Sequence, residues 1–273
     1  MQANCRSSKF IDKKFNEKLM PDIIDCWRQV NFNKKPYIHK NDEVLLGSDF
    51  HNYQDFDDYI KNKNFGLDDS KFHLNLVPVP YAGNILDARV YILMLNPGFG
   101  ILDYYSETRD SLYKEYAIKN VRQELNDDDF PFLYLNPKFL WHGGGQYWEG
   151  KLRDVIYDIS QAKSLSYVDS LSFLSKNVAA LELVPYHSKS YTLKDKIYSQ
   201  LYTPEMMLDF VRDYVVPKAI SGKACIISTR KSKLWSLPQN ENIVIYEGGH
   251  TRGAHLSKNT KGGKKILEFL LRN

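Results

Sequence analysis

Polar side chains stand at the ends of four short apolar segments, and one of these ends carries the amide of Asn96. Asn96 follows the segment 88–95 and begins the turn Asn96-Pro97-Gly98. A side-chain amide can orient a water molecule or hydrogen-bond a ligand, and a glycine lets the backbone approach that ligand closely. An ordinary strand followed by a turn is the alternative interpretation of these three residues. The other segments end in Tyr186, His187 and Ser188; in Arg230 and Lys231; and in His250, Arg252 and His255.

Each of the four segments is typical of a strand that is buried in a parallel sheet. They cover residues 88–95, 178–184, 223–228 and 243–246, and they are short and rich in Val, Ile, Leu and Ala. Because the carboxyl ends of parallel strands meet at one edge of a sheet, the polar residues are expected to line one cleft. The basic residues at two of the ends favour an anionic ligand such as a phosphate. A solvated surface turn is an equally good interpretation of Arg230-Lys231.

Helical patterns separate these strands and predict an α/β protein. We expect helices at 14–30, 103–125, 146–159, 167–174, 203–219 and 261–271, the first one divided at Pro21. The sequence therefore predicts a single three-layer α/β/α domain around a central, mostly parallel, four-stranded sheet. We assign residues 73–273 to this domain and residues 1–72 to an N-terminal helical or accessory extension. The part of the extension from 31 to 72 is expected to lie on the surface.

The composition fits a globular protein with an ordinary core. The chain has 273 residues, a net charge of +4 and 19 tyrosines, which suit ligand walls and wet interfaces. The mild positive charge permits contact with a polyanion without requiring it. The 3 cysteines fit neither a disulfide framework nor a zinc site and favour a reducing, cytoplasmic location. We find no signal peptide or long apolar span, so we expect a soluble protein that does not contact a membrane.

Two of these motifs resemble those of the uracil-DNA glycosylase superfamily. The turn Asn96-Pro97-Gly98 after a buried strand resembles the first motif of its Asn-Pro-Gly branches, and 80–84 (Pro-Tyr-Ala-Gly-Asn) resembles the pocket entrance of bacterial members. The segment from His250 to Ser257 resembles the second motif, with Thr251-Arg252 in place of the usual Pro-Ser. The resemblance implies a uracil-DNA glycosylase-like fold and a monofunctional glycosylase that leaves an abasic site in DNA. Some relatives remove modified, even glucosylated, cytosine in antiviral defence against phage.

The resemblance also implies roles for individual residues. Asn96 would orient the attacking water, while His250 would hydrogen-bond the departing base, with His255 as its alternative. Leu256 would be the wedge that fills the gap left by a flipped-out nucleotide, and a buried loop leucine is the competing interpretation. The expected substrate-binding residues are Pro97, Gly98, Phe99, Tyr105, Glu182, Tyr186, His187, Arg230, Arg252, His255, Leu256 and Ser257. Phe99 and Tyr105 are the candidates for stacking on the flipped base, and either could equally belong to the core.

Glu182 indicates which base is bound. It lies in an apolar segment and by rough position resembles the strand residue, usually an asparagine, that reads the base edge in the uracil enzymes. A carboxylate suits the exocyclic amine of cytosine and repels the carbonyl of uracil. If it is buried, its pKa should rise, and it could then protonate a poor leaving group. A glutamate at the strand edge that faces solvent is the alternative.

Besides a glycosylase that repairs uracil or mismatches in DNA, two other functions remain open at this point. One is a non-catalytic nucleic-acid sensor on the same scaffold, which the missing Pro-Ser favours. The other is a phosphoesterase that uses His187, His250 and His255 around a metal ion, although their spacing does not support it. Our main hypothesis is a monomeric enzyme that binds DNA and needs neither a metal nor a cofactor.

Overall fold

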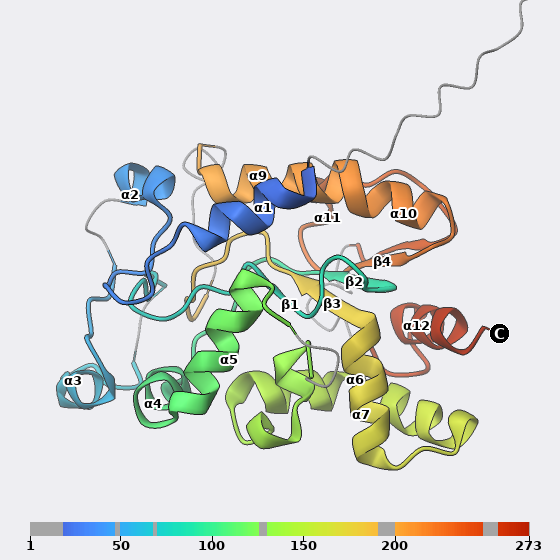
Figure 1. Cartoon of the computed structure of the whole chain (residues 1–273), viewed down its shortest axis with the longest axis horizontal. Helices are drawn as coiled ribbons and strands as arrows, with labels where there is room; N and C mark the ends of the chain where they lie inside the picture. The colour runs from blue at the N-terminus through green and yellow to red at the C-terminus, as the bar shows by residue number, and fades with distance from the viewer. Residues whose placement is uncertain are drawn as a thin grey trace, which may run out of the picture.

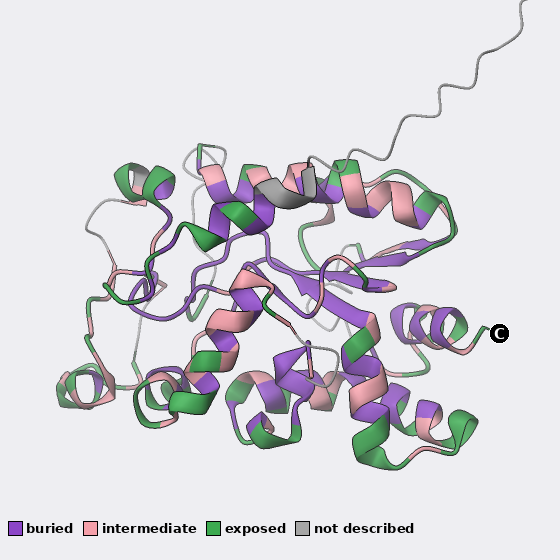
Figure 2. Cartoon of the chain, viewed as in Figure 1, coloured by how far each residue is buried: buried purple, intermediate pink, exposed green. Residues whose placement is uncertain are grey.

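The core of the protein is a five-stranded sheet in the order β1-β3-β2-β4-β5 (Figure 1). The computed structural model describes residues 19–46, 50–67, 70–125, 130–190, 200–247 and 256–272, and only the backbone of 19–22 and 45. The strands are β1 (Tyr81–Ala82), β2 (Val90–Leu93), β3 (Val178–Leu181), β4 (Cys225–Ser228) and β5 (Ile243–Ile245). The four strands that the sequence predicts are parallel to one another and pair as β3-β2-β4-β5. Every residue of β2, β3 and β4 is buried, as expected for central parallel strands (Figure 2).

The prediction of four strands was one strand short, because β1 pairs with β3 at the edge of the sheet in the antiparallel direction. This strand has only two residues, which is too short for a periodic pattern to show. The chain leaves β1 through Gly83, whose φ is +98°. A Cβ atom at this position would lie 2.5 Å from the carbonyl oxygen of Val178, so only glycine fits here.

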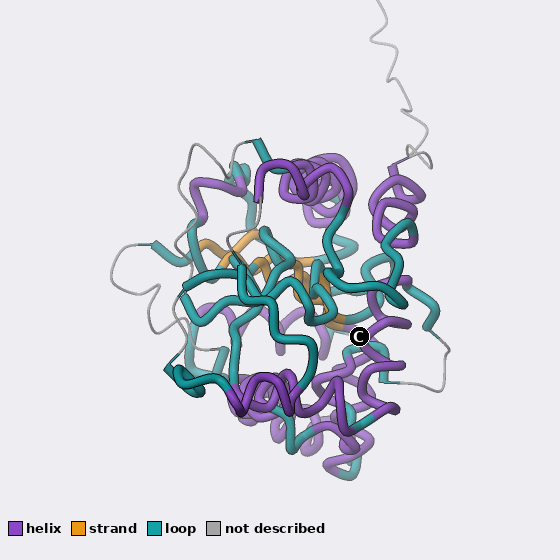
Figure 3. The backbone as a smooth tube through the Cα atoms, turned by 90° about the vertical axis from the view of Figure 1, so that its left-hand side faces the viewer, coloured by secondary structure: helices purple, strands orange, loops and turns teal. Residues whose placement is uncertain are grey.

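Helices cover both faces of the sheet (Figures 1 and 3). One face carries α1 (Leu19–Arg28), α9 (Tyr202–Phe210) and α10 (Val216–Ile220), with the π-helical turn η3 (Val211–Val215) joining the last two. The other face carries α5 (Ser111–Arg122), α6 (Gly143–Lys163), α7 (Tyr167–Asn177) and α12 (Lys261–Leu271). The shorter elements are α2 (Lys40–Leu46), α3 (Phe56–Lys61), α4 (Ile101–Arg109), η1 (Leu133–Leu135), η2 (Pro137–Phe139) and α11 (Ser232–Trp235). The protein is therefore α/β, with a mostly parallel sheet between helices.

Most helix boundaries differ from the expected ones by a few residues. The segment 103–125 forms two helices, α4 and α5, because Asp110 ends the first and caps the second by accepting a hydrogen bond from the Tyr113 amide. Within the described residues α1 spans Leu19–Arg28 and includes Pro21. Helix α12 has the expected bounds. None of the helices in the described part of the chain is both long and apolar enough to traverse a lipid bilayer.

The N-terminal segment contributes to the same core as the sheet. Trp27, Phe32 and Tyr37 are buried in the main hydrophobic cluster, so the expectation of a surface segment does not hold for this part of the chain. The buried carboxylate of Asp42 on α2 accepts hydrogen bonds from the Tyr186 hydroxyl (2.7 Å), the Thr203 hydroxyl (2.5 Å) and the backbone amide of Tyr202 (2.8 Å). Asp42 thus caps α9 from a distant part of the sequence.

We expect Asp42→Ala to lower the free energy of unfolding by about 3 kcal/mol, because it leaves several buried donors without an acceptor. The measurement is urea denaturation followed by circular dichroism. Glu43→Ala is the matched control, since Glu43 is the exposed neighbour on the same helix. Equal effects of the two substitutions would show that Asp42 does not hold the N-terminal segment.

Candidate functional site

A cleft of about 530 Å³ opens at the carboxyl ends of β2, β3 and β4. The strand order reverses around β2, since β3 lies on one side of it and β4 on the other. Ligand sites of open α/β sheets lie in such crevices. The strand-end residues that line the cleft are Asn96, Pro97, Gly98 and Phe99 after β2, Glu182, His187, Ser188, Lys189 and Ser190 after β3, and Arg230 after β4.

The amide of Asn96 is fixed in orientation by its nitrogen. Nδ2 donates to the carbonyl oxygen of Pro97 (3.0 Å) and to the hydroxyl of Ser188 (2.9 Å). Among the described residues no donor reaches Oδ1 of Asn96, and the side chain is only half-buried. The amide oxygen can therefore accept a hydrogen bond from a water molecule or a ligand in the cleft.

Glu182 is buried at the wall of the cleft instead of facing solvent. Glu182 is 7% exposed, and its Oε2 has no hydrogen-bond partner in the part of the chain that the structure describes. Burial raises the pKa of Glu182 to about 8, although the charge of Arg230 opposes this shift. At neutral pH the side chain is therefore largely a neutral carboxylic acid, which can donate a hydrogen bond or a proton.

His187 ties the loop after β2 to the segment before β1. Nδ1 lies 2.9 Å from the carbonyl oxygen of Gly98, and Nε2 lies 3.1 Å from that of Val77. The side chain is buried, and each of its two ring nitrogens faces a carbonyl oxygen. His187 thus fixes the Gly98 carbonyl at the cleft wall.

Asp103 and His142 also line the cleft and were not predicted from the sequence. Oδ2 of Asp103 accepts a hydrogen bond from the Gly100 amide (2.6 Å), and Oδ1 lies 2.9 Å from Nε2 of His142. Nδ1 of His142 accepts a hydrogen bond from the Gly144 amide (3.0 Å) and so caps α6. The pair joins the beginning of α4 to the beginning of α6, and both residues line the cleft.

The glycines after His142 serve packing more than they serve a ligand. Residues 143–145 form the first turn of α6, which therefore starts earlier than the helix expected at 146–159. A Cβ atom on Gly144 would lie 2.4 Å from the ring of Tyr134, and one on Gly145 would lie 2.3 Å from the Phe139 carbonyl oxygen. The absence of side chains lets α6 approach the preceding turns closely.

The two candidates for stacking on a base lie in different places. Phe99 lines the cleft, and its ring stacks on His73 with a centroid distance of 3.6 Å and an interplanar angle of 13°. Tyr105 does not line the cleft: it is 40% exposed and its ring contacts Phe56 and Trp141 edge-on. Of the two, Phe99 has the position that base stacking in the cleft requires.

Several other expected site residues lie away from the cleft. The side chain of Tyr186 is buried and points to the N-terminal segment, where its hydroxyl donates a hydrogen bond to Asp42. Leu256 is only 1% exposed and packs in the core beside α12. It is therefore the buried leucine of the alternative interpretation and does not project from the surface as a wedge. The carbonyl oxygen of Ser257 accepts hydrogen bonds from Thr260. The expected pocket entrance at 80–84 instead forms β1 and the turn after it.

His250, Arg252 and His255 lie outside the described residues, so their expected roles stay predictions. The same holds for two of the three histidines of the metal-dependent alternative. Among the described residues there is no group of three or more His, Cys, Asp or Glu side chains that could hold a metal ion.

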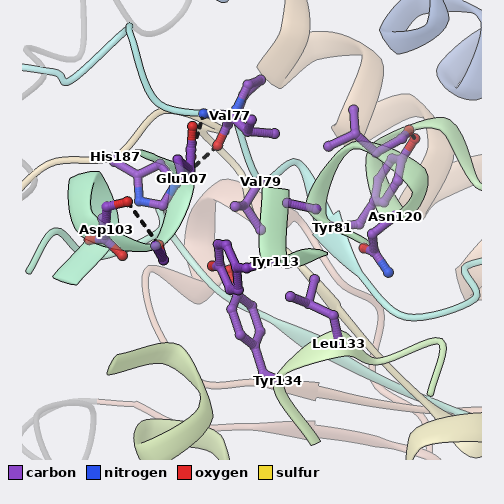
Figure 4. Close-up of a pocket in the computed structure, with 14 residues that line it drawn as sticks. Val77, Val79, Tyr81, Asp103, Glu107, Tyr113, Asn120, Leu133, Tyr134 and His187 are labelled. Carbon is purple, nitrogen blue, oxygen red and sulfur yellow. Dashed lines mark hydrogen bonds between the residues drawn. The ribbon is translucent and has the colours of Figure 1, made fainter. Parts of the chain in front are cut away.

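A small cavity of about 10 Å³ lies beside the cleft (Figure 4). Asp103, His187 and Tyr134 line both spaces, whereas Glu107 lines only the small one. Oε1 of Glu107 accepts a hydrogen bond from the Val77 amide (2.8 Å), and its Oε2 has no partner among the described residues. Burial raises the pKa of Glu107 to about 8. A cavity of this size has room for about one water molecule.

Comparison of the chain with protein-family models, with curated proteins and with solved structures finds no match. The function must therefore be inferred from the cleft itself.

We expect the Glu107→Gln variant to be more resistant to alkali than the wild-type protein. The pKa of Glu107 is 4.5 in the unfolded chain and about 8 in the folded protein. An acid with such a raised pKa stabilises the fold less and less as the pH rises from the first value to the second. Glutamine keeps the acceptor for the Val77 amide and cannot ionise, so the loss of unfolding free energy between pH 5 and pH 9 should shrink by on the order of 4 kcal/mol. Urea denaturation at several pH values provides the measurement.

The matched control for this experiment is Glu115→Gln, since Glu115 is an exposed carboxylate on α5 whose pair with Lys119 is also exposed. It should leave the pH dependence unchanged. A Glu107→Gln variant with the same pH dependence as the wild-type protein would contradict the buried neutral carboxyl.

Proposed function

We propose that this protein is a monofunctional DNA glycosylase that hydrolyses the N-glycosidic bond of a flipped-out, modified cytosine and leaves an abasic site. DNA of a phage with hydroxymethylated or glucosylated cytosine is the substrate that we favour. The observation that carries the proposal is that one cleft contains two polar atoms without a hydrogen-bond partner. Oδ1 of Asn96 and Oε2 of Glu182 have no partner among the described residues, and both side chains line the space beyond adjacent parallel strands.

The size and composition of the cleft support a nucleobase as the ligand. Its volume of about 530 Å³ lies in the range of small-molecule sites and leaves room for a base with a substituent. Phe99 offers an aromatic ring in the wall, and a flipped-out base is normally held by stacking and by hydrogen bonds to its edge. Arg230 and Lys189 at the same cleft provide positive charge for the phosphates of the strand.

The two polar groups supply complementary chemistry. Breaking an N-glycosidic bond develops positive charge on the sugar and negative charge on the base. The fixed amide of Asn96 can orient a water molecule toward the anomeric carbon, and its contribution is positional because an amide is a weak base. Glu182, which keeps its proton at neutral pH, can hydrogen-bond the base edge and donate that proton as the bond breaks.

We expect Asn96→Ala to reduce base release at least 100-fold while leaving DNA affinity nearly unchanged, because the amide orients the water and contributes little binding energy. Release is measured as alkali-labile strand breaks in oligonucleotides that contain 5-hydroxymethylcytosine or its glucosylated form. Asn64→Ala, in an exposed turn, is the control. Full activity of Asn96→Ala would remove this residue from the mechanism, and DNA binding by the wild-type protein without any strand breaks would favour the non-catalytic sensor.

For Glu182→Gln we expect intact binding and a loss of base release of 100-fold or more. Glutamine retains a donor and an acceptor at the position but cannot supply a proton. In the wild-type protein the rate of release should fall as the pH rises through about 8, since the acid form is lost above the pKa of Glu182. Single-turnover rates between pH 6 and pH 10, on DNA with modified cytosine and on matched DNA with uracil, give both results. Efficient release of uracil with none of the cytosine derivatives would refute the proposed substrate.

A further inference from the structure

Asp103 presents a second carboxyl group to the cleft, in a setting different from that of Glu182. It lies in the first turn of α4, five residues after Gly98, and 9% of the residue is exposed. Each of its oxygens has one partner: the Gly100 amide at Oδ2 and the His142 ring at Oδ1. A carboxylate oxygen can accept more than one hydrogen bond, so both oxygens keep the capacity to bind a further donor from the cleft.

His142 can orient Asp103 but has no atom to offer a substrate. Its Nδ1 accepts the hydrogen bond from the Gly144 amide, so the hydrogen of the neutral ring is on Nε2, which lies 2.9 Å from Asp103. The ring is 2% exposed and packs between Tyr113 and Tyr134, with centroid distances of 4.5 and 6.1 Å. His142 is thus a positioning residue for the carboxylate.

The surroundings of the two carboxyl groups push their pKa values in opposite directions. Burial raises that of Glu182 to about 8. Burial alone would also raise the pKa of Asp103, but the hydrogen bond from His142, the nearby His187 and the Gly100 amide together hold it below its ordinary value. A neutral acid and an ionised carboxylate therefore line one cleft, which is the usual arrangement of an acid and a base that act together.

We propose that Asp103 is a catalytic residue of this cleft: it stabilises the positive charge of the sugar and receives the proton of the attacking water, and His142 holds it in place. This inference rests on the proposed glycosylase function and adds a residue that neither sequence motif contains. In the reaction, the water oxygen forms a bond to the anomeric carbon while the bond from that carbon to the base nitrogen breaks. The electron pair of the broken bond stays on the base, which takes the proton of Glu182, and one proton of the water passes to Asp103.

The decisive experiment measures binding, so that it does not depend on turnover. One oligonucleotide carries a cationic pyrrolidine in place of a deoxyribose, which mimics the charged sugar, and a matched one carries a neutral tetrahydrofuran. We expect the wild-type protein to bind the pyrrolidine oligonucleotide at least tenfold more tightly at pH 7, and Asp103→Asn to bind both equally. Glu107→Gln is the matched control, because Glu107 is a half-buried residue on the same helix whose Oε2 is buried and which does not line the cleft, and it should keep the preference.

A second measurement separates the positioning role of His142 from a merely structural one. The preference for the cation should disappear in acid as Asp103 becomes protonated. Since the hydrogen bond from His142 helps to keep the pKa of Asp103 low, His142→Ala should move this loss to higher pH, and His142→Gln, which keeps a donor, should move it less. Thermal denaturation of each variant verifies that it is folded.

The outcomes distinguish this inference from the proposal on which it rests. If the wild-type protein binds neither oligonucleotide, the glycosylase function itself is contradicted. If it binds both with equal affinity, or if Asp103→Asn keeps the preference, the role of Asp103 is overturned while the function stands. An unchanged pH dependence in His142→Ala overturns the positioning role of the histidine.

Discussion

The parallel pairing of β3, β2 and β4 is the constraint on which the site depends. Leu93 pairs with Leu181 on one side and with Ser228 on the other, so the three strands end at nearly the same level. Asn96 then comes three residues after the end of β2, Glu182 one residue after the end of β3, and Arg230 two residues after the end of β4. No bond between these side chains is needed to bring them together, because backbone hydrogen bonds of the buried sheet set the register. A slip of one residue in either pair would turn each side chain of the slipped strand to the other face.

The sequence indicates features that depend on local pattern. Buried parallel strands are continuous apolar runs with abrupt ends, so the four parallel strands and the convergence of Asn96, His187 and Arg230 at one edge could be predicted. What could not be predicted depends on contacts between distant parts of the chain. β1 is two residues long and exists only because β3 lies beside it. Tyr186 follows a strand as His187 does, but its hydroxyl is bonded to Asp42, 144 residues away in sequence.

The same reason explains why Asp103 and His142 escaped the sequence analysis. An aspartate in the first turn of a helix and a histidine before three glycines are each common at helix starts, where they satisfy free backbone amides. Both do so here, since Asp103 accepts from the Gly100 amide and His142 from the Gly144 amide. Their proximity results from the tertiary fold, which brings the start of α4 and the start of α6 to the same cleft. The signal available in the sequence was the position of Asp103 just after the Asn-Pro-Gly turn, which alone does not separate a cap from a site residue.

The buried carboxyl of Glu182 changes the argument about base selection. An ionised carboxylate only accepts hydrogen bonds, so it suits the exocyclic amine of cytosine and disfavours the carbonyl that uracil has at this position. A protonated carboxyl has one donor and one acceptor and can pair with the edge of either base. Because burial raises the pKa of Glu182 to about 8, the protonated form prevails at neutral pH, and hydrogen bonding to Glu182 does not by itself exclude uracil. The proposed preference for a modified cytosine would then depend on the shape of the cleft, whose volume of about 530 Å³ would leave a bare pyrimidine loosely held. A bulky substituent that filled this space would hold the anomeric carbon near Asn96, so recognition and orientation would depend on the same contacts.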